Sequence, residues 1–289
     1  MPPACRHEPG EARVTRRRLL NALAVVLATL GCAPARPRRP PAERVEALRR
    51  TLPLGAPLDT TLGLLVAGDP GGTRVVLVHG TPGSAEGWAD YLLDPPPGLE
   101  LVALDRPGFG RSGPDDAVTS LALQAAAVAA LLPQDGRRAV LLGHSLGGPI
   151  VARVAAEHPQ RVAALVLLAP ALDPALERIH PLQPLGAWAP VRWLLPRAIR
   201  NANAELMALQ PELVALQPLL GRITAPVILL HGTADALVPV ENVPFAQSHL
   251  RAARCLVTRL LDGGNHFLPW SAPPVVRAAI EQAAAFAPC

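Results

Sequence analysis

Short, continuous runs of apolar residues recur along the chain and alternate with stretches of helical pattern. A strand buried on both faces of a sheet has such an uninterrupted run, whereas a half-solvated strand alternates apolar and polar residues. Because helical stretches separate several runs, the pattern predicts an α/β fold, a mostly parallel sheet with helices on both faces. The expected strands are Val75–His79, Leu99–Asp105, Ala139–Gly143, Val162–Leu168, Val227–His231 and Cys255–Leu260, with a weaker leading pair around and before Leu62–Ala67.

The segment 171–224 breaks this alternation. It is rich in proline and leucine, has no strand pattern, and is too long for a plain connection in a compact domain. We expect a small helical cap there, with short helical pieces such as Ala202–Gln217. Trp188, Trp193 and Met207 would line an apolar pocket under the cap, or else pack the cap on the core. The other expected helices are Leu121–Leu132, Pro149–His158 and Pro274–Phe286.

The turn after the run Ala139–Gly143 has the pattern Gly143-x-Ser145-x-Gly147. A serine on a sharp strand-to-helix turn projects its hydroxyl from the top of a sheet. Flanking glycines permit a strained backbone, and the N-terminus of the next helix directs its amides toward negative charge. The pattern predicts Ser145 as a nucleophile; a serine that only caps the helix is the alternative.

A serine nucleophile needs a base that accepts its proton and an acid that orients the base. His266 lies in a turn just after the expected strand Cys255–Leu260, and Asp235 just after Val227–His231. Loops at the carboxyl ends of parallel strands gather at one edge of the sheet. The order Ser145, Asp235, His266 along the chain is also the order of the catalytic triad in enzymes that carry a serine nucleophile on such a strand-to-helix turn. We therefore expect His266 to be the base and Asp235 the acid.

Three other aspartates compete with Asp235 for the role of orienting acid. Asp173 follows the preceding expected strand and stays an alternative. Asp105 precedes the nucleophile in sequence and is expected to be structural. Asp262 is expected only to shape a turn.

A loop rich in glycine and proline, residues 79–84, follows the first of the six expected strands. Such a loop offers a backbone N–H to a tetrahedral oxyanion, as does the residue after the nucleophile. The expected oxyanion-binding amides are therefore those of Thr81 and Leu146. An ordinary turn is the alternative.

Taken together, these motifs resemble those of the α/β-hydrolase superfamily, from about Leu62 to near the C-terminus. The resemblance implies the α/β-hydrolase fold, with Ser145 as nucleophile, His266 as base and then acid, and Asp235 as orienting acid. Serine rather than aspartate at the nucleophile position argues against haloalkane dehalogenase and epoxide hydrolase activity. The matching motifs are His79-Gly-Thr-Pro-Gly, Asp105-Arg-Pro-Gly-Phe-Gly-Arg-Ser112, Gly143-His-Ser-Leu-Gly-Gly148, Gly232-Thr-Ala-Asp235 and Asn265-His266-Phe.

The N-terminal segment, residues 1–32, has the pattern of an export signal. It contains Thr15-Arg-Arg-Arg-Leu-Leu, which resembles a twin-arginine motif, and an apolar run too short for a typical spanning helix. The run ends before Cys32, in a context that resembles a lipoprotein processing site. We expect export, with Cys32 as the candidate lipidated residue; an uncleaved anchor and cleavage without lipid are the alternatives. Residues 33–51 are the expected tether, and residues 52–289 the hydrolase domain, in the periplasm or anchored outside the cytoplasmic membrane.

Positive charge is concentrated in the N-terminal segment. Residues 1–50 carry 11 arginines against 4 glutamates, whereas the rest of the chain carries 16 arginines against 19 acidic residues. Nucleic-acid binding needs a basic face on the folded domain, so no such partner is expected. The chain has no lysine, which excludes a lysine nucleophile. No Cys/His spacing or glycine pattern predicts a metal or nucleotide, so no cofactor is expected; a disulfide between Cys255 and Cys289 stays open.

The sequence thus predicts a serine hydrolase that cleaves a small ester-like substrate through an acyl-enzyme intermediate. Carbon–carbon bond hydrolases, thioesterases, amidases and haloperoxidase-like enzymes use the same framework and stay open. A non-catalytic exported binding protein on a hydrolase scaffold is a second alternative. Action on lipid-like substrates at a membrane, to which the N-terminus would attach the protein, is a third.

Overall fold

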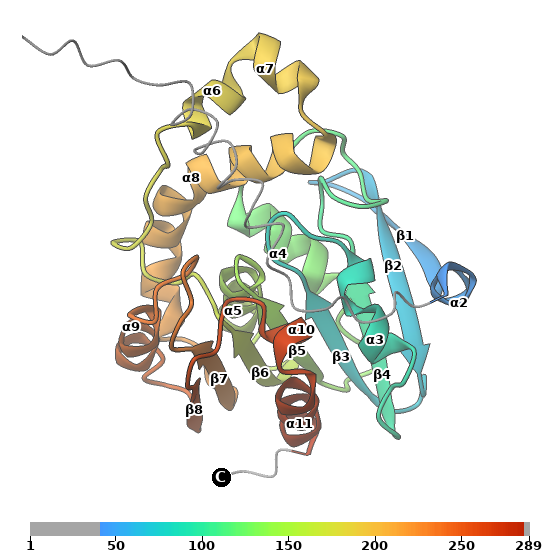
Figure 1. The fold of residues 1–289 in the computed structure, drawn as a ribbon. Helices are drawn as coiled ribbons and strands as arrows, with labels where there is room; N and C mark the ends of the chain where they lie inside the picture. The colour runs from blue at the N-terminus through green and yellow to red at the C-terminus, as the bar shows by residue number, and fades with distance from the viewer. Residues whose placement is uncertain (1–40, 286–289) are drawn as a thin grey trace, which may run out of the picture. The chain divides into compact units, whose positions relative to one another are not determined.

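The apolar runs form the centre of an eight-stranded sheet in the computed structural model, which describes residues 41–285 (Figure 1). The strand order is β1-β2-β4-β3-β5-β6-β7-β8. Strand β2 runs antiparallel to β1 and β4, and all other neighbouring pairs are parallel. The strands are β1 Arg49–Leu54, β2 Thr60–Gly68, β3 Thr73–Val78, β4 Leu99–Leu104, β5 Ala139–His144, β6 Val162–Leu168, β7 Val227–Gly232 and β8 Leu256–Leu261.

The six predicted strands are confirmed within two residues at each end, and the α/β fold class is confirmed. The predicted tether over residues 33–51 ends too late. Helix α2, Ala42–Ala47, buries Val45, and β1 pairs with β2 from Arg49 onward. Residues 42–51 therefore belong to the folded unit. Residues 1–40 and 286–289 lie outside the described residues. The predicted export signal, the candidate lipidation site Cys32, and Cys289 of the undecided disulfide with Cys255 therefore lie there too.

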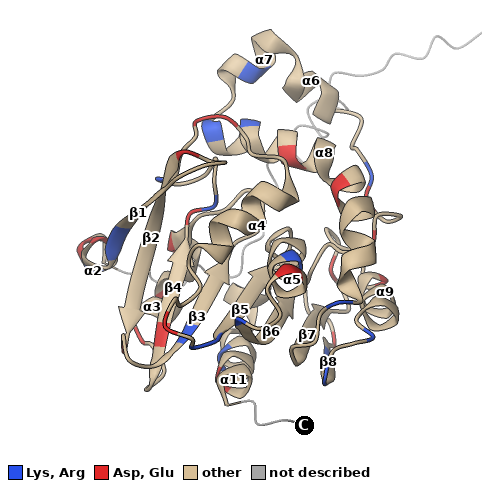
Figure 2. Ribbon diagram, turned by 180° about the vertical axis from the view of Figure 1, so that it is seen from behind, with Lys and Arg blue, Asp and Glu red and all other residues tan. Residues whose placement is uncertain are grey.

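Helices cover both faces of the sheet. Helices α4, α5, α8 and α9 lie on one face and α3 and α11 on the other, as the two opposite views show (Figure 1 and Figure 2). The remaining helices are η1 Ala85–Trp88, α3 Ala89–Leu92, α4 Leu121–Ala129, α5 Gly147–Glu157, α6 Gln183–Ala187, α7 Ala189–Leu194, α8 Arg197–Leu220, α9 Asn242–His249, α10 Leu268–Ser271 and α11 Pro273–Ala284. No helix within residues 41–285 is long and apolar enough to cross a membrane.

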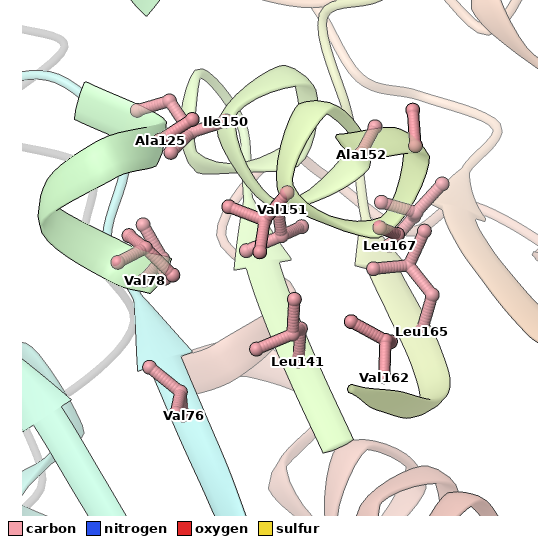
Figure 3. Packing of buried hydrophobic residues seen from close by; sticks show 14 of the residues in the cluster. Val76, Val78, Ala125, Leu141, Ile150, Val151, Ala152, Val162, Leu165 and Leu167 are labelled. Atoms are coloured by element: carbon pink, nitrogen blue, oxygen red, sulfur yellow. The ribbon is translucent and has the colours of Figure 1, made fainter. Parts of the chain in front are cut away.

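The core around α5 fixes the position of the strand β5 that precedes it. Ile150 and Val151 of α5 are fully buried and belong to the same apolar cluster as Leu141 of β5 and Leu165 of β6 (Figure 3). Burial of each such side chain contributes about 1.5–3 kcal/mol. The α5 helix is held on the sheet in this way, so the turn between β5 and α5 has little freedom.

The short helices α6 and α7 lie in the predicted cap segment, and the helical piece predicted at Ala202–Gln217 lies within the longer helix α8. It continues through Pro211, whose missing N–H removes a helical hydrogen bond. Packing explains the continuity: Leu209, Leu213, Leu216 and Leu220 recur on one side of the helix and are buried in the main core. Their burial outweighs the cost of the proline, and the C-terminal half of α8 is thus part of the main core rather than of a separate cap.

Candidate active site

The backbone at Ser145 is strained into the left-handed region, where its φ is 55°. Few residues other than glycine adopt this conformation, and such strain concentrates at functional sites. The turn also packs tightly. A Cβ on Gly80 would lie 2.8 Å from the Cβ of Ser145, and a Cβ on Gly147 would collide with the carbonyl of Val78. The half-buried Ser145 therefore stands on a sharp turn between β5 and α5, against the loop 79–84.

The predicted pair of His266 and Asp235 meets at the carboxyl ends of β8 and β7. Nδ1–H of His266 donates to Oδ2 of Asp235 over 2.7 Å, and Oδ1 of Asp235 accepts from the amides of Leu237 and Val238, each over 2.9 Å. With Nδ1 protonated, Nε2 of His266 is left as the acceptor. The His266 ring lies 4.8 Å, centroid to centroid, from the ring of His144, which directly precedes Ser145 in the chain.

Asp235 is set up to stay ionised. Burial raises the pKa of its carboxyl, but the hydrogen bond and charge of His266 and the amides of Val238 and Leu237 outweigh burial, and the pKa ends below its usual value. A carboxylate in this position fixes the imidazole tautomer and stabilises positive charge on the ring.

The rival aspartates have other partners. The amide of Ala175 donates to Oδ1 of Asp173, and Asp262 accepts from the hydroxyl of Thr233. Asp105 accepts from the amides of Ala85 and Arg111 and forms an ion pair with Arg49, while burial, the largest influence, raises its pKa. Of the four candidates, Asp235 is the one hydrogen-bonded to His266. These contacts support Asp235 as the orienting acid.

Two histidines that the sequence analysis did not single out support this pair. Nε2 of His144 lies 2.9 Å from the carbonyl of His266, and burial lowers the pKa of His144 to about 3, so the neutral ring donates a hydrogen bond. Nε2 of His231 donates in the same way to the carbonyl of Val238 over 3.0 Å. Burial also lowers the pKa of His231. Their positions next to Ser145 and at the end of β7 were the available sequence signal.

The buried Arg106 ties the loop 79–84 to helix α8. Its Nε donates to the carbonyl of His79 and its Nη2 to that of Gly80, both over 3.0 Å. Its Nη1 and Nη2 also donate to the two carboxylate oxygens of Glu205, over 2.6 and 3.0 Å. Burial and the charge of Arg106 lower the pKa of His79 well below its usual value, so its neutral ring accepts a hydrogen bond from the Arg106 amide. Arg106 thus fixes the loop 79–84 to helix α8 through these hydrogen bonds.

The substitution Glu205→Gln is expected to destabilise the fold by about 3–5 kcal/mol, because it leaves the Arg106 guanidinium buried without its anion. Chemical denaturation measures this loss. The matched control is Asp116→Asn, which breaks the solvent-exposed pair with Arg192 and should cost less than about 1 kcal/mol. Equal, small losses in both variants would contradict a structural role for the buried pair.

The predicted pocket lining from the cap is wrong for its two tryptophans. Trp188 is 62% exposed and Trp193 is 83% exposed, because helices α6 and α7 contain no buried residue. Met207 is partly buried and lies beside Asn203 on α8. The loop residue Thr81 is partly buried next to Gly80, and Leu146 directly precedes α5. Within residues 41–285 no group of three or more metal-ligating side chains gathers that could hold an ion.

Comparison with known proteins agrees with this geometry. The sequence pattern of the family described as the alpha/beta hydrolase fold matches residues 73–200, which include the loop 79–84 and the turn at Ser145. The eight-stranded, mostly parallel sheet is the one seen in solved structures of that fold. The match covers less than half of the chain.

Proteins that are similar to this chain differ in activity. The chain is 29% identical to a pimeloyl-[acyl-carrier protein] methyl ester esterase of Edwardsiella ictaluri, over 66% of this chain and 85% of the relative. It is 39% identical over 102 residues, 35% of this chain, to a dihydrolipoyllysine-residue acetyltransferase component of the acetoin cleaving system of Cupriavidus necator, but spans only 27% of that protein. The crystal structure of a Paleococcus ferrophilus monoacylglycerol lipase superposes with a TM-score of 0.64 and 24% identity, over 77% of this chain and 98% of the lipase.

Proposed function

We propose that this α/β hydrolase cleaves ester-like substrates with Ser145, His266 and Asp235 as its catalytic triad. The observation that carries the proposal is the 2.7 Å hydrogen bond between His266 and Asp235, at the carboxyl ends of β8 and β7. Ser145 follows the carboxyl end of β5 in the same sheet, and a serine, a histidine and an aspartate are the groups that acyl transfer of this kind requires. The relation to a methyl ester esterase supports an ester as the bond that is cleaved.

The proposed reaction has two halves. In the first, Nε2 of His266 takes the proton of the Ser145 hydroxyl as Oγ attacks the carbonyl carbon, and then returns the proton to the leaving alcohol. In the second, His266 takes a proton from water as the water oxygen attacks the acyl carbon. The bond from that carbon to Oγ of Ser145 then breaks, His266 returns the proton to Oγ, and the carboxylic acid leaves. The amides of Thr81 and Leu146 bind the oxyanion in both halves; each such donor is typically worth ~10²–10³ in rate.

Hydrolysis of a p-nitrophenyl ester series from acetate to palmitate tests the reaction class, with fluorophosphonate labelling as an independent test of the nucleophile. We expect the full-length protein to be labelled at Ser145 and to hydrolyse at least part of the series. Labelling without ester turnover would keep the nucleophile and move the substrate to thioesters, amides or carbon–carbon bonds. If the protein is neither labelled nor active on any ester of the series, the proposal is refuted and a binding protein on this scaffold is favoured.

We further propose that the enzyme works outside the cytoplasm, attached to a membrane through its N-terminus. The support is the sequence of residues 1–32, in which arginines and an apolar run precede Cys32. Separation of cells into soluble and membrane fractions tests this location. Recovery of the protein with its N-terminus intact in the cytosolic fraction would contradict it.

A further inference from the structure

Helices α6 and α7 present an apolar surface that the rest of the described chain, residues 41–285, leaves open. Trp193 is 83% exposed and Leu194 is 85% exposed, and neither helix contains a buried residue. Helices of this length are marginal in water by themselves, and contiguous exposed apolar patches mark interaction surfaces. We define the cap patch by its six most relevant side chains, Leu182, Leu185, Trp188, Trp193, Leu194 and Ile199.

The segment that carries the cap patch is positively charged. From Arg178 to Ala204 it contains four arginines and no aspartate or glutamate. Asp115 and Asp116, from the loop after β4, form ion pairs with three of these arginines. Two aspartates against these three arginines leave one positive charge uncompensated beside the patch. Figure 2 shows these basic positions on α7 and at the start of α8.

The cap patch lies at the end of the molecule where the candidate active site opens. Helices α6 and α7 lie beyond the carboxyl ends of the parallel strands in Figure 1. Ser145 and His266 follow the carboxyl ends of two of these strands, β5 and β8. A surface that covered the patch would therefore face the same side of the molecule as the triad.

We propose that the cap patch docks on the surface of a bilayer that contains anionic lipid. Tryptophan and leucine on one surface with arginine beside them is the composition of helices that lie in the lipid headgroup region, and each basic residue adds attraction to anionic lipid. A second copy of the chain fits the patch less well, because a two-fold contact would bring the uncompensated arginines of both copies together.

Docking is tested with the full-length protein and vesicles that contain phosphatidylglycerol and brominated phosphatidylcholine. Brominated lipid quenches only tryptophans that enter the bilayer, and residues 1–40 contain none. Because Trp270 is 41% exposed, all variants carry Trp270→Phe, so that the readout reports on Trp188 and Trp193. We expect quenching of the wild-type protein that weakens when neutral vesicles or high salt are used. The double substitution Leu185→Ser/Leu194→Ser keeps both tryptophans. It is expected to raise the lipid concentration needed for half-maximal quenching about tenfold or more.

The matched control is Leu260→Ser, which changes a side chain that is 53% exposed on β8, away from the cap. It should be quenched like the wild type. The measurement is repeated with Ser145→Ala, because docking does not depend on catalysis and should survive a failure of the proposed hydrolase function. Equal quenching of the cap variant and the wild type, or no quenching at all, would overturn the proposal. A shift from dimer to monomer in the cap variant, without any effect of lipid, would assign the patch to a second copy instead.

Discussion

The substitution Ser145→Ala is expected to lower kcat on p-nitrophenyl esters by about 10⁶, to a residual rate that oxyanion binding alone supports. The change removes the only atom that would form the acyl-enzyme and leaves the surrounding turn in place. Alanine has the same Cβ as serine, and the hydrogen bond from the Ser145 amide to the carbonyl of Leu168 does not involve the side chain. We therefore expect an unchanged thermal unfolding midpoint, together with complete loss of fluorophosphonate labelling.

Ser248→Ala is the matched control for this prediction. Ser248 lies on α9, where its exposed hydroxyl donates to the carbonyl of Phe245. Its loss should leave kcat and labelling at wild-type values. Retention of more than about a hundredth of the activity in purified Ser145→Ala protein would move the nucleophile to another residue. The unfolding midpoint excludes a general loss of folding as the cause of lost activity.

The strands could be predicted well because a parallel sheet covered on both faces leaves a simple signal. Each of β5, β6 and β7 is almost wholly buried, and apolar residues fill nearly every position before the histidines His144 and His231 near the ends of β5 and β7. Strand β1 lies at the edge of the sheet, has only exposed and partly buried positions, and contains Pro53. Its sequence resembles that of a tether for this reason. Only the pairing with β2 shows that it belongs to the sheet.

The cap was harder to predict because local and tertiary preferences disagree within it. The helix predicted at Ala202–Gln217 runs through Pro211, as α8 does, but α8 is longer because its buried leucines continue along the core to Leu220. The prediction that Trp188 and Trp193 line a pocket was wrong for a different reason. A large apolar side chain is usually buried, and nothing in the local sequence shows that α6 and α7 stand outside the core.

Some residues of the candidate site could be predicted from the sequence and others could not. The triad candidates could be named from the sequence because each follows a predicted strand within a recognisable turn. The partner of Arg106 could not, since Glu205 lies 99 residues away on a helix whose path depends on tertiary packing. The supporting roles of His144 and His231 likewise come from contacts with residues of other loops.

The second large effect is expected for Asp235→Asn, which should lower kcat by up to about 10⁴. The asparagine oxygen still accepts from the amides of Leu237 and Val238, so the turn keeps its shape. Its NH₂ group then faces Nδ1 of His266, where the carboxylate oxygen now accepts over 2.7 Å. A donor at this position favours the tautomer with the proton on Nε2, and that nitrogen no longer accepts the proton of Ser145. Steady-state kinetics on the best p-nitrophenyl ester measures the effect.

Asp173→Asn decides between the two acids that the sequence left open. The Asp173 carboxylate accepts from the amide of Ala175, and an asparagine oxygen replaces it there. We therefore expect near wild-type kcat in this variant. If Asp173→Asn instead lost activity while Asp235→Asn kept it, the hydrogen bond between Asp235 and His266 would be structural, and the orienting acid would lie one strand earlier in the sheet. Loss in both variants would indicate that both carboxylates act on His266, although of the two Asp235 is the one hydrogen-bonded to it.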